Sequence, residues 1–67
     1  MEDFEFDTWL KKELKQRRMT QKELAYRSGI EPSTISNHIV KKTSPTLRTF
    51  MAILDALHME IKIVDSM

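Results

Sequence analysis

Short polar side chains gather in the middle of the sequence, at Ser33, Thr34, Ser36 and Asn37. Hydroxyl and carboxamide groups donate and accept hydrogen bonds without carrying a charge. On one helix, such groups could bond to the edges of DNA bases and to phosphate oxygens. They bond equally well to water, so the residue types alone leave both interpretations open.

The helix that precedes these residues has a recognisable start and end. Thr20 and Glu23 have the spacing of a capping box, in which the Thr20 hydroxyl accepts the Glu23 amide proton and the Glu23 carboxylate reaches back to the Thr20 amide. Gly29, the only glycine, can adopt the left-handed conformation that ends a helix. The sequence therefore predicts a helix over residues 20–28.

A second helix follows after a very short turn. Pro32 favours the first turn of a helix, where its missing N–H costs nothing, and predicts a helix over about residues 32–40. Gly29 and Ile30 lie between the two helices. The helices must therefore pack at a steep angle, with the small Ala25 where they cross. This is the frame of a helix-turn-helix, whose second helix can lie in the major groove of DNA.

Two further helices flank this pair. Apolar residues at helical spacing predict a first helix over about residues 5–18, and Ser44-Pro45 predicts the cap and first turn of a last helix that reaches about Leu57. The sequence therefore predicts an all-α, compact four-helix fold, with residues 1–67 as a single domain. The side chains expected to face the core are Phe6, Trp9, Leu10, Leu14, Leu47, Phe50, Ile53, Leu54 and Leu57.

Residues 59–64 alternate between apolar and polar side chains, which is typical of a strand. A lone strand leaves its backbone groups unpaired, and antiparallel pairing with a second copy across a two-fold axis would satisfy them. The alternative is that these residues continue the last helix or extend from the domain. The expected dimer interface consists of Met59, Ile61, Lys62 and Ile63.

Length and composition exclude several classes of protein. Sixty-seven residues form one small domain, and the absence of cysteine excludes disulfides and thiolate metal sites. No apolar run approaches the roughly 20 residues that span a bilayer, and the acidic start is unlike a secretory signal. We therefore expect a soluble, cytoplasmic protein with no membrane partner.

The formal net charge is only +1, so any attraction for DNA must come from the distribution of charge. Acidic residues gather within positions 2–7, and basic residues gather within positions 11–18 and 41–48. The basic groups border the predicted helix pair and would suit a phosphate backbone. They would equally suit solvated helix faces, and both interpretations stay open.

The stretch 20–40 resembles the helix-turn-helix of the Cro/cI-type (XRE-like) phage-repressor family. The matching residues are Gln21, Ala25, Gly29, Ile30, the run Thr34–Asn37, Pro45, Leu47 and the run Phe50–Leu57. The resemblance implies a lambda-repressor-like fold and a sequence-specific transcriptional repressor or regulator, of phage, mobile-element or antitoxin type, that binds double-stranded operator DNA. It also implies a nucleoid-associated protein of prokaryotic or phage origin. The C-terminal segment is similar to the end of HipB-type antitoxins, which implies a homodimer.

The resemblance also implies which residues contact DNA. The family positions that read bases fall on Pro32, Ser33 and Asn37, and Pro32 departs from the long polar residue that is frequent there. The expected base contacts are therefore Ser33, Thr34 and Asn37, with Asn37 foremost because its carboxamide can bond the adenine N6/N7 edge twice. Asn37 could instead only cap or bind water. The expected phosphate contacts are Arg18, Gln21, Lys22, Ser36, Lys41, Lys42, Thr43 and Arg48.

Two positions differ from the family in another way. Many relatives pair a buried Arg with a Glu at the places of Leu14 and Ile39, and an exchange to two apolar residues is tolerable, so we predict that Leu14 contacts Ile39. His38 stands where an apolar residue is usual, and we predict a half-buried packing residue. With His58 distant in sequence, we expect neither a metal site nor a cofactor.

Two alternative functions stay open. The protein could act mainly as an antitoxin or adaptor that binds a toxin or another protein, in which case an exposed apolar patch should remain on the dimer. It could also be a helix-turn-helix that has lost DNA binding and only mediates contacts. We expect no enzyme activity, because no nucleophile, base and orienting acid recur at a meaningful spacing and there is no glycine-rich phosphate loop.

Overall fold

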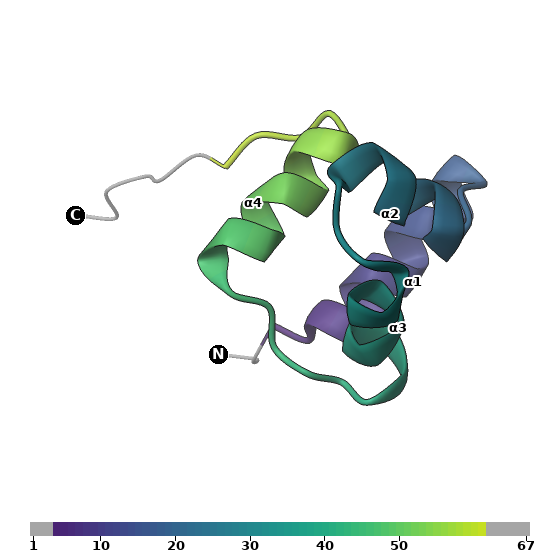
Figure 1. Ribbon diagram of the computed structural model, residues 1–67. Coiled ribbons are helices and arrows are strands. Elements are labelled where there is room, and N and C mark those ends of the chain that lie inside the picture. Colours follow the sequence, from purple (N-terminus) through teal and green to yellow (C-terminus); the bar gives the residue numbers. More distant parts are fainter. Residues whose placement is uncertain (1–3, 62–67) are drawn as a thin grey trace.

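Four α-helices make up the fold in the computed structural model, which describes residues 4–61 (Figure 1). They are α1 (Phe6–Arg17), α2 (Gln21–Ser28), α3 (Pro32–Val40) and α4 (Leu47–Ala56). α1 packs against α3, α3 against α2, and α2 against α4. The predicted all-α, four-helix architecture is confirmed, and α2 and α3 have nearly the predicted bounds.

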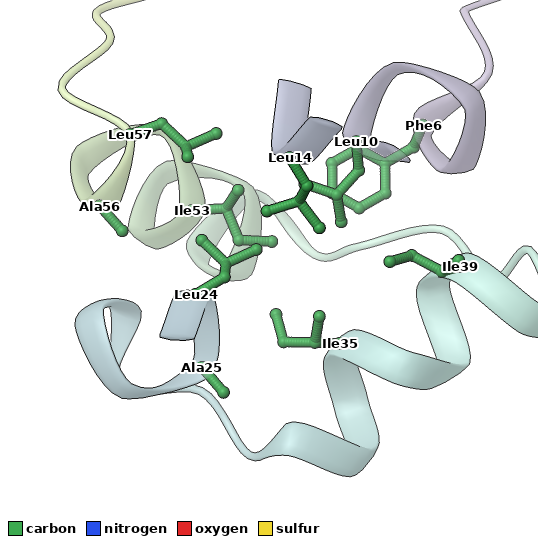
Figure 2. Close-up of a cluster of buried hydrophobic side chains, with 10 residues drawn as sticks. All are labelled: Phe6, Leu10, Leu14, Leu24, Ala25, Ile35, Ile39, Ile53, Ala56 and Leu57. Carbon is green, nitrogen blue, oxygen red and sulfur yellow. The ribbon is translucent and has the colours of Figure 1, made fainter. Parts of the chain in front are cut away.

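The hydrophobic core draws side chains from every helix (Figure 2). The longest helix, α1, has 12 residues, and helices of this length are marginal in water when isolated. They form here because their apolar faces pack together, and this packing fixes how each helix is rotated about its own axis. The core contains Phe6, Leu10, Leu14, Leu24, Ala25, Ile35, Ile39, Ile53, Ala56 and Leu57.

The two ends of α2 follow the local signals in the sequence. Thr20 Oγ1 accepts a hydrogen bond of 3.0 Å from the Glu23 amide, as predicted. The reciprocal half of the capping box is wrong, because the Glu23 carboxylate instead lies 3.0 Å from the Arg27 guanidinium. Gly29 ends the helix with φ of 73° and donates its N–H to Ala25 O at 3.0 Å. The sharp turn between α2 and α3 thus rests on the one glycine of the chain.

The start of α4 differs from the prediction. Its N-cap is Thr46, whose Oγ1 accepts from the Thr49 amide at 3.2 Å, so Ser44 does not cap the helix. The expectation that Leu47 faces the core is also wrong, since its side chain is 70% exposed. Leu47 precedes the fully buried Ile53 by six residues, which places it about 120° away around the helix.

Three residues other than glycine adopt the left-handed conformation. Arg18 has φ of 54° after α1, Lys42 has φ of 56° between α3 and α4, and His58 has φ of 58° after α4. This conformation costs an L-residue roughly 1–2 kcal/mol, so the surrounding structure must hold it in place. Arg18 and His58 follow helix ends where glycine is usual, Lys42 lies in the connection after α3, and all three side chains are exposed.

The described part of the C-terminal segment is irregular. Met59 is half-buried and donates its N–H to Leu54 O at 2.8 Å, and Ile61 is 46% exposed. Residues 59–61 form no strand, while Lys62, Ile63 and the rest of the predicted strand lie outside the described residues. The paired strand needs a second copy of the chain, so this expectation stays a prediction.

Candidate nucleic-acid interface

The solvent-facing side of α3 carries the side chains predicted to contact bases. Ile35 and Ile39 are buried in the core, which turns the opposite side of α3 outward. Ser33 and Asn37 lie one helical turn apart at the centre of this outward face, and both are exposed. Two half-buried side chains, Thr34 and Ser36, border this face on either side.

Val40 belongs to the same outward face and was missed by the sequence analysis. Its side chain is 71% exposed, although it lies in a helix with a largely apolar inner side. The signal was present in the spacing, because Val40 follows Asn37 by three residues and Ser33 by seven, which places them on one side of a helix. An exposed valine next to amide and hydroxyl groups suits contact with the methyl group of thymine.

His38 is fully buried, not half-buried as predicted, with only 6% of its surface exposed. Its Nδ1 lies 2.9 Å from the Thr43 carbonyl oxygen and 2.9 Å from Thr43 Oγ1. A carbonyl oxygen only accepts, so Nδ1 carries the proton and donates it toward Thr43. Nε2 is then the bare nitrogen, and it is buried with no hydrogen-bond partner among the described residues.

These bonds hold the connection between α3 and α4 against the last turn of α3. The Lys41 amide donates to Asn37 O at 3.0 Å, and the Thr43 amide is 3.5 Å from the same oxygen. Together with the His38 bonds, they position the segment 41–43, which we call the clamp loop. Lys41, Lys42 and Thr43 are all exposed in it. The Thr43 hydroxyl accepts from His38 and keeps its own proton to donate, for instance to a phosphate.

The predicted phosphate contacts at the other end of the helix pair lie around the start of α2. Gln21 is the first residue of α2 and lies beside backbone N–H groups that have no partner within the helix. Such groups favour anions. Arg18 and Lys22 are exposed nearby in sequence, with Arg18 in the left-handed turn after α1.

Arg48 lies apart from these residues, in the first turn of α4, and is exposed. α4 packs chiefly against α2. Arg48 is therefore the predicted phosphate contact with the weakest structural link to the outward face of α3.

Within residues 4–61, no ion pair involves a residue predicted to contact phosphates. Among residues 4–61, Arg17 pairs with Glu13 at 3.4 Å and Arg27 pairs with Glu23 at 3.0 Å. Both pairs join residues four apart on one helix and use arginines that were not predicted to contact DNA. In this part of the chain, the cationic groups that were so predicted have no carboxylate partner.

Leu14 and Ile39 both point into the core from α1 and α3 (Figure 2). Both are buried, at 6% and 8% exposure. Burial of both side chains fits the expectation that two apolar residues replace the Arg–Glu ion pair of many relatives. Direct contact between Leu14 and Ile39 stays a prediction.

The described residues contain no group of three His, Asp or Glu side chains that could hold a metal ion. Over the same residues, no helix is both long and apolar enough to cross a membrane.

The family model described as helix-turn-helix matches residues 10–63, which include most of α1 and all of α2, α3 and α4. Comparisons with curated proteins and with solved structures found no match. The chain belongs to the helix-turn-helix family of Cro/cI-type (XRE-like) DNA-binding transcription regulators.

Proposed function

We propose that the protein is a sequence-specific transcriptional repressor that binds operator DNA as a homodimer, of the phage, mobile-element or antitoxin type. One observation carries this proposal: Ser33 and Asn37 lie exposed and one turn apart on α3, while Ile35 and Ile39 anchor the opposite side in the core. A rigidly held helix with an uncharged polar outer side suits the major groove. Occupation of the operator represses without any chemical step.

Base reading is assigned to few side chains. Asn37 bonds the N6/N7 edge of an adenine, and Ser33 and Thr34 donate or accept at neighbouring base edges. Val40 contacts a thymine methyl group from the same face. Because α3 carries no ionised Lys or Arg, these contacts supply discrimination more than affinity.

Affinity comes from the basic residues around α3. The clamp loop holds the phosphates at one end of α3, and Gln21 with Lys22 and Arg18 holds them near the start of α2. If about five phosphates are contacted per subunit, a dimer contacts about ten, and the slope of log affinity against log salt is about −9. The two subunits read half-sites roughly 34 Å apart.

Selection of bound duplexes from a random pool tests the proposal. The protein should recover one palindromic sequence, and binding should weaken steeply with salt. Asn37→Ala should reduce the preference for the adenine at its position by about 5- to 150-fold. Lys41→Ala is the matched control, since loss of a phosphate contact weakens binding to all sequences alike and reduces the salt slope by about 1.

Each failure has a separate meaning. A sequence preference that survives Asn37→Ala would overturn the role of Asn37. An absence of salt-dependent binding to any duplex would overturn DNA binding by this chain as a whole.

A second function is supported by the exposed apolar side chains of α4. Leu47 is 70% exposed and Met51 is 53% exposed, and this apolar surface suits a protein-binding antitoxin or adaptor if it stays exposed in the dimer. Such a function is compatible with DNA binding. A toxin-like gene next to the coding sequence would favour it.

A further inference from the structure

The solvent-facing side of α4 combines apolar and charged residues. We define the α4 face as Leu47, Arg48, Met51 and Asp55. Leu47 and Met51 are 70% and 53% exposed, although they are large apolar side chains, and Arg48 and Asp55 are exposed as well. Nothing in residues 4–61 forms an ion pair with Arg48 or Asp55. An apolar strip bordered by two unpaired opposite charges is a surface suited to a charge-complementary partner.

The two charges lie on the same edge of the α4 face. Arg48 and Asp55 are seven residues apart, which is almost two turns, so their positions differ by only about 20° around the helix. Along the axis they are separated by about 10.5 Å. Met51 lies between them, and Leu47 lies on the other side of Met51 from this charged edge.

This pattern is complementary to itself when two copies pair antiparallel. A two-fold axis between Met51 and Ala52 brings Arg48 level with the partner's Asp55, because both positions lie three and a half residues from the axis. The two-fold axis also keeps the charged edges of the two copies on the same side of the helix contact. Arg48 of each copy therefore meets Asp55 of the other, and two equivalent ion pairs form.

The same pairing gives each Leu47 a place to bind. A hollow of about 320 Å³ lies at the C-terminal end of α4, and it is lined by Met51, Leu54, Asp55, Met59, Glu60 and Ile61. Along the helix axis, Leu47 of one copy lies level with position 56 of the second copy, just past Leu54 and Asp55, which line this hollow. Each copy therefore offers one protruding Leu47 and one hollow that can receive it.

We propose that the α4 face is the surface through which two copies of this chain associate, antiparallel and across a two-fold axis between Met51 and Ala52. The inference rests on the proposed function in that it names the surface for its homodimer. It assigns Arg48 to the partner's Asp55 and removes it from the set of phosphate contacts. α4 is only about 15 Å long, so the interface is small and suits a reversible dimer.

A charge swap tests the inference with the full chain. Sedimentation equilibrium at low salt over a range of protein concentrations gives the dimer dissociation constant. Arg48→Asp and Asp55→Arg should each raise this constant at least about tenfold, because each replaces two attractive pairs with two repulsive ones. The double variant should return it to within about threefold of the original, since the swapped pair is attractive again.

Two exposed apolar residues provide a matched comparison. Leu47→Ser should also raise the dissociation constant, because it leaves the hollow of each partner empty. Tyr26→Ser removes a side chain that is 89% exposed on α2 and should have no effect. Both positions are exposed, so neither substitution endangers folding.

Several results would overturn the inference. These are a chain that stays monomeric at all concentrations, a double charge swap that fails to restore the dimer, and a dimer that responds to Ile63→Asp but to neither charge reversal. Binding of the monomer to a single half-site reports separately on the proposed function. If salt-dependent half-site binding persists while the charge swap fails, the α4 surface is wrong and DNA binding stands.

Discussion

Substitution of His38 by leucine gives the sharpest test of the structure, because two opposing effects act on one side chain. His38 donates from Nδ1 to Thr43 at 2.9 Å, and its Nε2 is buried with no partner in the described part of the chain. Leucine has a similar size, fills the buried site and removes both nitrogens. The change therefore deletes a satisfied donor and an unsatisfied acceptor together.

The magnitudes favour a more stable variant. A neutral hydrogen bond contributes about 0.5–1.5 kcal/mol, whereas a buried polar atom without a partner costs about 1–3 kcal/mol. The Thr43 carbonyl belongs to an exposed residue, so water can replace the lost donor. We expect His38→Leu to raise the free energy of unfolding by about 1 kcal/mol, which is about 4–8 °C in Tm for a domain of this size.

The same change should weaken DNA binding. Loss of the bond to Thr43 releases the clamp loop from α3, and the energy of one hydrogen bond corresponds to about a two- to tenfold loss of affinity. Stability and affinity should thus move in opposite directions. A variant with lower stability and unchanged affinity would show that His38 acts only in packing.

Urea unfolding followed by fluorescence measures the effect on stability. Trp9 is the only tryptophan and lies within 6 Å, between ring centroids, of Phe4, Phe6 and Phe50, so its emission reports on the core. Thr43→Val is the control, since it keeps the carbonyl acceptor and should change stability by less than about 1 kcal/mol. A destabilisation of more than about 1 kcal/mol in His38→Leu would refute the reasoning, because Nε2 would then have a partner.

Three further substitutions test other features. Gly29→Ala should lower the unfolding free energy by about 1 kcal/mol from backbone strain alone, since φ is +73° and a Cβ would meet nothing within 4 Å; a much larger loss in urea unfolding would contradict this account. His58→Gly should raise Tm, as it relieves an exposed left-handed residue with φ of 58°, and an unchanged or lower Tm would argue against strain there. Leu14→Arg should abolish the cooperative transition seen by circular dichroism, because it puts a charge at a buried position of the core; a folded variant would contradict the predicted contact of Leu14 with Ile39.

Local signals in the sequence determined the helix-turn-helix. Thr20, Gly29 and Pro32 act on backbone groups within four residues of themselves, so they predict the bounds of α2 and α3 without knowledge of the rest of the fold. The outward positions of Ser33 and Asn37 followed from the same helical spacing. Membership of the family could be inferred for the same reason, since the motif is continuous in the sequence.

Helical spacing in the sequence predicted the inward sides of α1 and α4 except at Leu47, and only the tertiary structure decided that residue and the start of α4. Ser44 and Thr46 are both capable of capping a helix, and the packing of Ile53 selects Thr46 and turns Leu47 outward. Burial of His38 and its bonds to Thr43 depend on where α1 covers α3.

The residues with a left-handed backbone conformation could not be predicted from the sequence either. Arg18 and Lys42 have no preference for this conformation and lie between helices that the core holds in place, while His58 adopts it directly after α4. The sequence by itself therefore determined the recognition motif, which is local. The surfaces beside it depend on contacts between residues far apart in the chain, and these exist only once the four helices have packed.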